Sequence, residues 1–318
     1  MVTEPVLGIA ERSALVAVAR RFYFEDRSKI EIADEFGYSR FKVARMLEQA
    51  RAAGIVTIAL HDQGTLLPDL SARLVTELGL TEAVVVESDG SEVIARQHVA
   101  TAAADLLSRT LRDGELLGIS WGRTLSAMTE TLPSLPGVSV VQLTGTVGSN
   151  FEQSPVEIVR KVAQSSGGSA HPIFAPMVVD NAATAAALRQ QSDVAQAIKL
   201  FGDVTTAVLA LGSWDPTESQ LAETVPDAKR AELIARGVVA EVAATLIARD
   251  GSLVAPDFAD HCIAIGADQI RAIPRVLLVA AGERKAVAAR AVVRAGLLTG
   301  IVTDRVLAEA LLAEQPEA

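Results

Sequence analysis

The stretch LLGISWGRTL (residues 116–125) places a short apolar run directly before a turn that contains Ser120, Gly122 and Thr124. A short apolar run bounded by turn residues is typical of a buried strand, and a helix can begin where the glycine ends the turn. The stretch therefore predicts a strand ending at Ser120, a tight turn, and a helix starting near Thr124. Turns of this kind lie at the carboxyl edge of a parallel sheet, where open α/β folds bind their ligands.

Further apolar runs alternate with helical patterns along the rest of the chain. They are AVVVE (83–87), VSVVQL (138–143), VTTAVLALG (204–212), CIAIG (262–266), RVLLVAAG (275–282) and GIVTD (300–304). Alternation of strands and helices at this length predicts an α/β fold, a doubly wound parallel sheet with helices on both faces. The composition agrees, because half of the residues are apolar and only 4% are aromatic.

The length of 318 residues is comfortable for a small domain followed by a larger one. HDQGTLLPDL (61–70) interrupts both the helical and the strand-like spacing of apolar residues. We therefore place the domain boundary between residues 1–61 and 62–318. Residues 66–78 then predict an amphipathic helix that joins the domains or pairs subunits. The single cysteine, Cys262, excludes a disulfide framework and a cysteine-based zinc site. No apolar run approaches the ~20 residues of a membrane span, so we expect a cytoplasmic protein without a membrane partner.

The net charge of −10 is unevenly distributed along the sequence. Residues 1–60 carry nine basic and eight acidic side chains, whereas the rest of the chain holds 20 basic and 31 acidic ones. Residues 39–51 contain four basic side chains and only one acidic side chain, that of Glu48. A local excess of this kind either is a solvated surface or contacts phosphates.

The first sixty residues predict a helix-turn-helix. Apolar residues recur at helical spacing over residues 12–24, Ser28 can cap a second helix that ends at Gly37, and Ser39 can cap a third. The spacing of Ala33, Gly37 and Val43 is typical of two helices that approach closely across a short turn. The alternative is a helical hairpin in an all-α cap.

The third helix has an apolar side and a basic side. Its predicted DNA-contacting set is Ser39, Arg40, Phe41, Lys42 and Arg45, which would enter the major groove of an operator. GIVTIAL (54–60) would follow as a short strand or wing, giving a winged helix-turn-helix domain.

The turn after residues 116–119 predicts an anion site. Backbone N–H groups of Gly122, Arg123 and Thr124 would point at one place, the hydroxyls of Ser120 and Thr124 add donors, and Arg123 adds charge. An ordinary strand-to-helix connection needs the same small residues and remains the alternative.

Two other strand exits carry similar signals. QLTGTVGSN (142–150) is rich in glycine and hydroxyl groups, and AAGERK (280–285) places Lys285 in the first turn of the next helix. A lysine there opposes the helix dipole, so it either points to solvent or holds a bound anion.

These residues together resemble the SorC family of bacterial transcriptional regulators, which join a helix-turn-helix to a sugar-phosphate-sensing domain. The segments that carry the resemblance are IEIADEFGYSRFKVARMLEQARAAGIVTI, GISWGRTL, VVQLTG, VLALGS, LLVAAGERKAVAARAVV and GIVTDRVLAEALL, in that order and over nearly all of the chain.

The resemblance implies an effector domain similar to sugar-phosphate isomerases such as glucosamine-6-phosphate deaminase, used as a sensor without turnover or cofactor. It implies that the phosphate lies on the turn at residues 120–124 with Lys285 nearby, and that family members commonly act as tetramers on paired operator half-sites. For this chain we expect a homo-oligomer, a dimer or a tetramer, that binds operator DNA. The effector-binding residues that it implies are Ser120, Gly122, Arg123, Thr124, Gly145, Thr146, Glu241, Gly282 and Lys285. Thr146, Arg123 and GVVAEV (237–242) depart from the usual pattern of the family.

Metal binding and catalysis find little support in the sequence. The four histidines show no metal-ligand spacing, so we expect no metal site. An isomerase- or deaminase-like enzyme with a helical cap is the alternative function, but Glu241 has no convincing histidine or carboxylate partner for proton transfer. Asp257, Asp260 and His261 are interpreted as a solvated loop, and Asp304 as the N-cap of the last helix.

Overall fold

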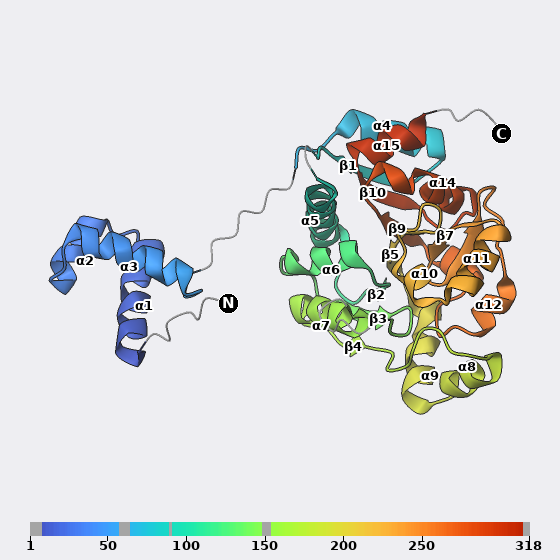
Figure 1. Cartoon of the computed structure of the whole chain (residues 1–318), viewed down its shortest axis with the longest axis horizontal. Coiled ribbons are helices and arrows are strands. Elements are labelled where there is room, and N and C mark those ends of the chain that lie inside the picture. Colours follow the sequence, from blue (N-terminus) through green and yellow to red (C-terminus); the bar gives the residue numbers. More distant parts are fainter. Residues whose placement is uncertain (1–7, 57–63, 89–90, 148–153, 314–318) are drawn as a thin grey trace. The chain divides into compact units, whose positions relative to one another are not determined.

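The computed structural model describes residues 8–56, 64–88, 91–147 and 154–313. It divides the chain into two compact units, residues 1–60 and 61–318, which Figure 1 draws with a thin grey trace between them. The boundary expected from the sequence falls one residue later. Among the described residues, no helix is long and apolar enough to cross a membrane.

The first unit holds three helices, α1 (Ile9–Tyr23), α2 (Lys29–Phe36) and α3 (Arg40–Ala52). Ser28 accepts a hydrogen bond from the Glu31 N–H while the Glu31 carboxylate accepts one from the Ser28 N–H, which completes a capping box before α2. Ser39 caps α3 by accepting from the Lys42 N–H at 3.2 Å. The two N-caps predicted from the sequence are confirmed.

A short turn joins α2 to α3 and fixes their approach. Gly37 has a φ of 65°, in the left-handed region that glycine adopts at low cost, and it ends α2 as expected. Ala33 and Val43 are buried where the two helices meet. The wing expected over residues 54–60 lies mostly outside the described residues, since these end at Val56 in this unit.

The second unit is built on one parallel sheet of seven strands, in the order β1-β10-β9-β5-β2-β3-β4. The strands are β1 (Glu82–Val86), β10 (Gly300–Asp304), β9 (Arg275–Val279), β5 (Thr206–Ala210), β2 (Leu116–Ile119), β3 (Ser139–Gln142) and β4 (Ala170–His171). The predicted strands at 83–87, 116–120, 138–143, 204–212, 275–282 and 300–304 are all confirmed. The short edge strand β4 was not predicted.

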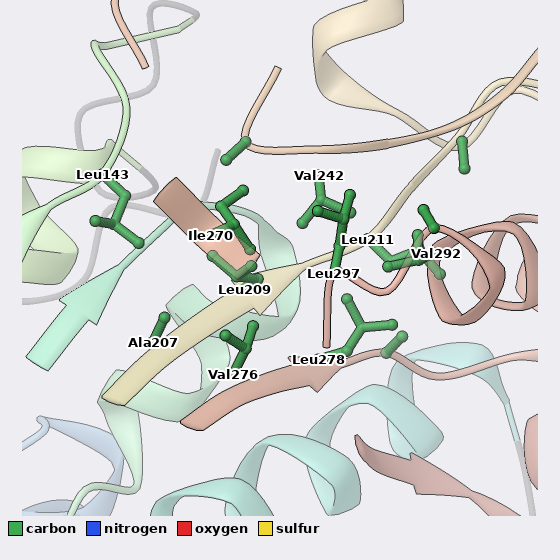
Figure 2. Close-up of a cluster of buried hydrophobic side chains, with 14 of the residues drawn as sticks. Leu143, Ala207, Leu209, Leu211, Val242, Ile270, Val276, Leu278, Val292 and Leu297 are labelled. Atoms are coloured by element: carbon green, nitrogen blue, oxygen red, sulfur yellow. The ribbon is translucent and has the colours of Figure 1, made fainter. Parts of the chain in front are cut away.

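Helices cover both faces of this sheet (Figure 1), because alternate strand residues point to opposite sides. One face packs against α5 (Glu92–Thr110), α6 (Arg123–Glu130) and α7 (Pro155–Ser166). The other packs against α4 (Pro68–Leu78), α14 (Ala286–Arg294) and α15 (Arg305–Leu312). Figure 2 shows part of this second core, where Leu209, Val276 and Leu278 of the sheet meet Ile270, Val292 and Leu297. The doubly wound arrangement is therefore confirmed.

The chain leaves the sheet in opposite directions at β2 and β5, which are neighbours. From β2 it runs through α6 to β3 and on to β4 along one face, and from β5 it reaches β9 and then passes through α14 to β10 along the other. Such a switch point opens a crevice at the carboxyl ends of the two strands. The fold thus places a ligand site beside the residues that follow β2 and β5.

Residues between β5 and β9 form a smaller layer that the sequence did not predict. Its antiparallel sheet has the order β6-β7-β8. Its elements are β6 (Gly212–Ser213), α10 (Gln220–Thr224), α11 (Asp227–Ala235), β7 (Val238–Val242), β8 (Thr245–Ala248), α12 (Pro256–Asp260) and α13 (Ala267–Ala272). Between β4 and β5 lie α8 (Ala182–Arg189), α9 (Ser192–Lys199) and the 3-10 turn η2 (Leu200–Asp203), and a second such turn, η3 (Glu283–Lys285), precedes α14.

Two sequence expectations in this unit are wrong. CIAIG (262–266) does not join the parallel sheet, because loops hydrogen-bond to its backbone on both sides. On one side the Gly145 N–H donates to the Ile263 carbonyl and the Ile265 N–H donates to the Leu143 carbonyl, and on the other the Ile263 N–H donates to the Met177 carbonyl. Residues 256–260 form the short helix α12 and not a loop. The helix expected over residues 66–78 begins at Pro68, because residue 66 pairs with β1.

Candidate functional site

A cavity opens at the switch point between β2 and β5. Six of the residues expected to bind an effector line it, namely Ser120, Gly122, Arg123, Thr124, Glu241 and Lys285. They come from the turn after β2, from β7 and from the end of η3, so the fold gathers segments that are up to 165 residues apart in the sequence. The other wall is the backbone that leaves β5, at Ala210, Leu211 and Gly212.

The turn after β2 is held close to the end of β5. A Cβ atom on Gly122 would lie 2.9 Å from the Cβ of Ala210, and Gly122 has a φ of 144°. Both features require glycine. The Ala210 N–H donates to Ser120 Oγ at 3.0 Å, which leaves the Ser120 hydroxyl proton free to donate toward a ligand.

Helix α6 begins directly at this turn and points its N-terminus at the cavity. Its first N–H groups, from Arg123 onward, have no partner within the helix, because the hydrogen bond from Ser126 to Gly122 is the first of the helical series. Thr124 is buried and faces the cavity. Unpaired N–H groups and the helix dipole together favour an anion here.

Lys285 reaches the same cavity from the end of η3. Its side chain is 9% exposed, and its ammonium donates to the Leu211 carbonyl at 3.1 Å. Burial, followed by the nearby positive charge of Arg123, lowers the pKa of Lys285 to about 8. A bound anion would reverse both effects, because it stabilises the charged ammonium.

The charges around the cavity do not balance. Arg96 forms an ion pair with Glu92, and Glu218 forms one with Arg284 at 3.0 Å. Within the described part of the chain, the Arg123 guanidinium has no hydrogen bond or ion pair. Arg123 and Lys285 are thus two neighbouring cations that form no ion pair among the described residues, although the Glu218 and Glu241 carboxylates lie near Lys285.

Glu241 also lines the cavity, where it lies beside Gly212 and within range of the Lys285 charge. Its Oε1 accepts from the Ser219 hydroxyl at 2.7 Å, while Oε2 is buried and accepts no hydrogen bond of good geometry. Burial raises the pKa of Glu241 to about 7; Ser219, the Trp214 indole and the Lys285 ammonium act in the opposite direction. Gly212 makes room for this carboxyl, since a Cβ there would lie 2.3 Å from Oε1. Glu241 can therefore accept from or donate to a ligand hydroxyl.

Three residues expected near the effector do not line this cavity. Gly145 and Thr146 pack on the segment around Ala175, where a Cβ on Gly145 would lie 2.6 Å from the Ala175 oxygen and the Thr146 hydroxyl donates to that oxygen at 3.1 Å. Gly282 lies at another strand exit, where its N–H donates to Asp304 Oδ1 at 3.0 Å. Asp304 lies at the N-cap position of α15 as expected, but its side chain makes no cap hydrogen bond there.

Several lining residues were missed from the sequence. Arg96 lies in α5, and Glu218 and Ser219 lie in the loop between β6 and α10. None of them follows a strand of the parallel sheet directly, so the strand-exit pattern could not find them. Their position depends on the crossing of α5 and on the inserted antiparallel layer.

The described residues contain no cluster of histidine, cysteine and carboxylate side chains that could hold a metal ion. Cys262 is buried, and burial raises the pKa of its thiol to about 12. A thiol in this environment is an unreactive core residue.

The exposed side of α3 presents the residues expected to contact DNA. Arg40, Phe41 and Arg45 are exposed at its start, and Phe41 is 86% exposed although it is apolar. Lys42 differs, because its ammonium lies 3.8 Å from the centre of the Tyr38 ring in a cation–π contact. In the described residues, neither Arg40 nor Arg45 has a hydrogen bond or ion pair, so both guanidinium groups can reach bases or phosphates.

Comparisons with known proteins agree with this two-part organisation. The model of the sugar-binding domain family (Sugar-bind) matches residues 64–313. The chain is 25% identical over 305 residues to the sorbitol operon regulator of Klebsiella pneumoniae, covering 94% of this chain and 97% of that protein. It is 24% identical over 301 residues to the deoxyribonucleoside regulator of Bacillus subtilis strain 168, covering 93% and 96%.

The fold is also found in solved structures. The crystal structure of the full-length sorbitol operon regulator SorC from Klebsiella pneumoniae superposes with a TM-score of 0.73 and 23% identity, and the match covers 96% of this chain and all of that one. The chain therefore belongs to the SorC family of transcriptional regulators, and residues 64–313 form its sugar-binding domain.

Proposed function

We propose that the protein is a cytoplasmic DNA-binding regulator of carbohydrate metabolism whose operator affinity is controlled by a phosphorylated sugar or polyol. The observation that carries the effector class is the cavity at the N-terminus of α6, which Arg123 and Lys285 line without either of them forming an ion pair among the described residues. A phosphate monoester carries a charge of about −1.5 to −2 at pH 7, which matches two cations. Glu241, which lines the same cavity, would bind a hydroxyl group of the sugar.

Control of DNA binding follows from linkage. If the effector binds the DNA-competent and incompetent arrangements unequally, it must change the affinity for DNA by the same factor. A coupling of ~1–3 kcal/mol corresponds to a change of roughly 5- to 150-fold. The sequences of the relatives do not set the sign, so either induction or activation satisfies the proposal.

Enzymatic turnover is the second candidate, and Glu241 is the observation that favours it. A carboxyl group that titrates near pH 7 inside a cavity is suited to general acid–base chemistry. However, no histidine lines the described part of the cavity, and Glu218, the other carboxylate, is held by Arg284. We therefore propose a sensor without turnover, and incubation with a panel of pentose, hexose and amino-sugar phosphates should return each compound unchanged.

The DNA part of the proposal is tested on α3. Selection from random double-stranded DNA would give an operator, and fluorescence anisotropy at fixed salt would give affinities. Replacing Arg40 or Arg45 by Ala should cost ~1–3 kcal/mol if the guanidinium pairs with a base, with relaxed specificity at one position. Arg12→Ala, an exposed arginine on α1, is the matched control. Unchanged affinity of the Arg40→Ala/Arg45→Ala variant would refute this role of α3.

Assembly is part of the same proposal. A single helix-turn-helix covers one half-site, so we expect dimers or tetramers that bind two half-sites one helical turn or a multiple apart. Mass measurement in solution at micromolar concentration, with and without the selected operator, tests this. A monomer under both conditions would contradict it.

A further inference from the structure

The cavity that lies between Arg123 and Glu241 is small in this structure. It holds about 40 Å³ of free space, which is room for about three water molecules. Sites for small organic ligands usually measure ~300–1,000 Å³. A phosphate group can approach the N-terminus of α6, but the carbon skeleton of a sugar needs more enclosed space, which displacement of one wall would provide.

One wall is shared with a larger space behind it. Ala243 and Ala244, the turn between β7 and β8, line the cavity on one side and a groove of about 520 Å³ on the other. The far side of the groove is formed by Leu253, by Ala267 at the start of α13, and by Cys262. Displacement of this turn would therefore transfer volume from the groove to the cavity.

The shared turn is also conformationally strained. Val242 pairs with Thr245, so Ala243 and Ala244 form a two-residue hairpin loop, and their φ angles are 47° and 67°. Such loops favour Asn and Gly, because other residues rarely adopt positive φ. Both alanines are buried, at 8% and 4% exposed, so packing holds them in this conformation. Strained residues of this kind cluster at ligand clamps and switch segments.

We propose that the turn at Ala243 and Ala244 is the movable wall of the effector site and sets the size of the sugar that the site accepts. The proposal rests on the proposed function, because it assigns the cavity to a phosphorylated sugar. When the effector binds, the turn shifts into the groove and releases its positive-φ strain. Glu241 lies two residues before Ala243 on the same strand, so a shift of the turn also acts on the carboxyl group whose Oε2 has no hydrogen-bond partner.

The test fills the groove without touching the cavity. Ala267→Phe and Leu253→Trp each place a large side chain in the groove, and neither residue lines the anion cavity. Ala272→Phe, exposed on the same helix α13 but outside the groove, is the matched control. Calorimetry would measure inorganic phosphate, glycerol 3-phosphate, ribose 5-phosphate, sorbitol 6-phosphate and glucose 6-phosphate against each purified full-length variant.

Both groove-filling variants should weaken the tightest-binding pentose or hexose phosphate at least tenfold, and should leave inorganic phosphate within twofold of the wild type. The control should match the wild type for every compound. Hydrogen exchange at residues 242–246 should change with the sugar phosphate and not with inorganic phosphate.

Two results would overturn the proposal in distinguishable ways. If the wild type binds a sugar phosphate and both groove-filling variants bind it equally well, the turn does not move into the groove, while the proposed function stands. If the wild type binds neither inorganic phosphate nor any of the sugar phosphates, the proposed function fails and the movable wall fails with it.

Discussion

Two glycine turns at the same edge of the sheet look alike in sequence and differ in structure. Gly122 follows β2 and Gly282 follows β9, both have positive φ, of 144° and 98°, and each precedes the start of a helical segment. The sequence predicted an anion site at the first turn, and the family resemblance implied effector binding at Gly282 in the second. Only the turn at Gly122 faces a cavity with unpaired cations, whereas the Gly282 N–H is occupied by Asp304.

The two turns differ in whether the protein supplies its own carboxylate as an acceptor for the backbone N–H groups. Asp304 is 1% exposed, and its carboxylate accepts from the Gly282 N–H and, at 3.3 Å, from the Ser88 hydroxyl. An internal carboxylate thus takes the place that a ligand would occupy. At Gly122 no side-chain carboxylate caps α6, so its first N–H groups remain available. A strand-to-helix turn binds an anion where the protein leaves that position without an acceptor of its own.

The largest expected effect is the loss of phosphate affinity when a cation that lines the cavity at Gly122 is removed. Lys285→Ala should raise the Kd for a phosphate monoester roughly 10- to 150-fold, because loss of a charge-assisted hydrogen bond costs about 1.5–3 kcal/mol. Arg123→Ala should act in the same direction. Calorimetric titration with glycerol 3-phosphate measures both.

Lys199→Ala is the matched control for these two variants. Lys199 is an exposed lysine at the end of α9 and does not line the cavity. Its removal should change the Kd by less than threefold. Equal losses in Lys199→Ala and Lys285→Ala would show a general effect of net charge and would remove the distinction between the turns.

The next largest effect concerns the room for a side chain at each of the two glycines. Gly122→Ala should destabilise the protein by at least about 1–3 kcal/mol, because it combines an unfavourable φ with a clash against Ala210. In Gly282→Ala the nearest atom is 3.9 Å from the new Cβ, so only the strain remains. Thermal unfolding compares the two variants. Gly122→Ala alone should also lose phosphate affinity; a loss in both would contradict the assignment.

The pH dependence of binding sharpens the role of Lys285. Its pKa is about 8 in the free protein, and a bound phosphate dianion must raise it. Binding therefore takes up a proton above pH 8, and the affinity should fall by up to about tenfold per pH unit. Lys285→Arg keeps its charge over this range, so its affinity should stay flat between pH 8 and 9.5. If the phosphate affinities of the wild type and Lys285→Arg change with pH in the same way, Lys285 does not contact the anion.

The smallest effect is expected at the occupied turn. Asp304→Asn keeps an acceptor for the Gly282 N–H but removes the charge, which should cost about 0.5–1.5 kcal/mol of stability. Phosphate affinity should be unchanged, because Asp304 lies outside the anion cavity. Chemical denaturation measures the stability. An increase in phosphate affinity would mean that the Asp304 charge had kept an anion away from the Gly282 turn.

Much of the fold could be predicted because its signals are local. The caps at Ser28 and Ser39 and the strand exit at Gly122 each depend on residues that are neighbours in the sequence. The CIAIG segment has the same local signal as a sheet strand, and it was predicted as one. It pairs with loops instead, because the loop after β3 and the segment around Met177 occupy both of its edges. Apolar periodicity cannot distinguish these partners.

The candidate site was predicted only in part for a similar reason. Ser120 and Thr124 follow from one turn, and Lys285 from a helix start that opposes the dipole. Arg96 and the pairing of Glu218 with Arg284 depend on how α5 and the inserted layer cross the end of the sheet. Gly145 and Gly282 show the reverse case. A glycine is needed at Gly145 because the backbone of the segment around Ala175 packs closely against it, and at Gly282 the backbone N–H is bonded to Asp304.

The most direct test of the central claim is the position of a bound anion. A crystal structure of the full chain with tungstate, whose anomalous signal locates the metal atom, would place it without assumptions about the effector. The account predicts an anion within hydrogen-bonding distance of the Arg123 and Thr124 N–H groups and the Lys285 ammonium. An anion at the Gly282 turn, or a cavity at Gly122 that stays empty while tungstate binds elsewhere, would contradict it.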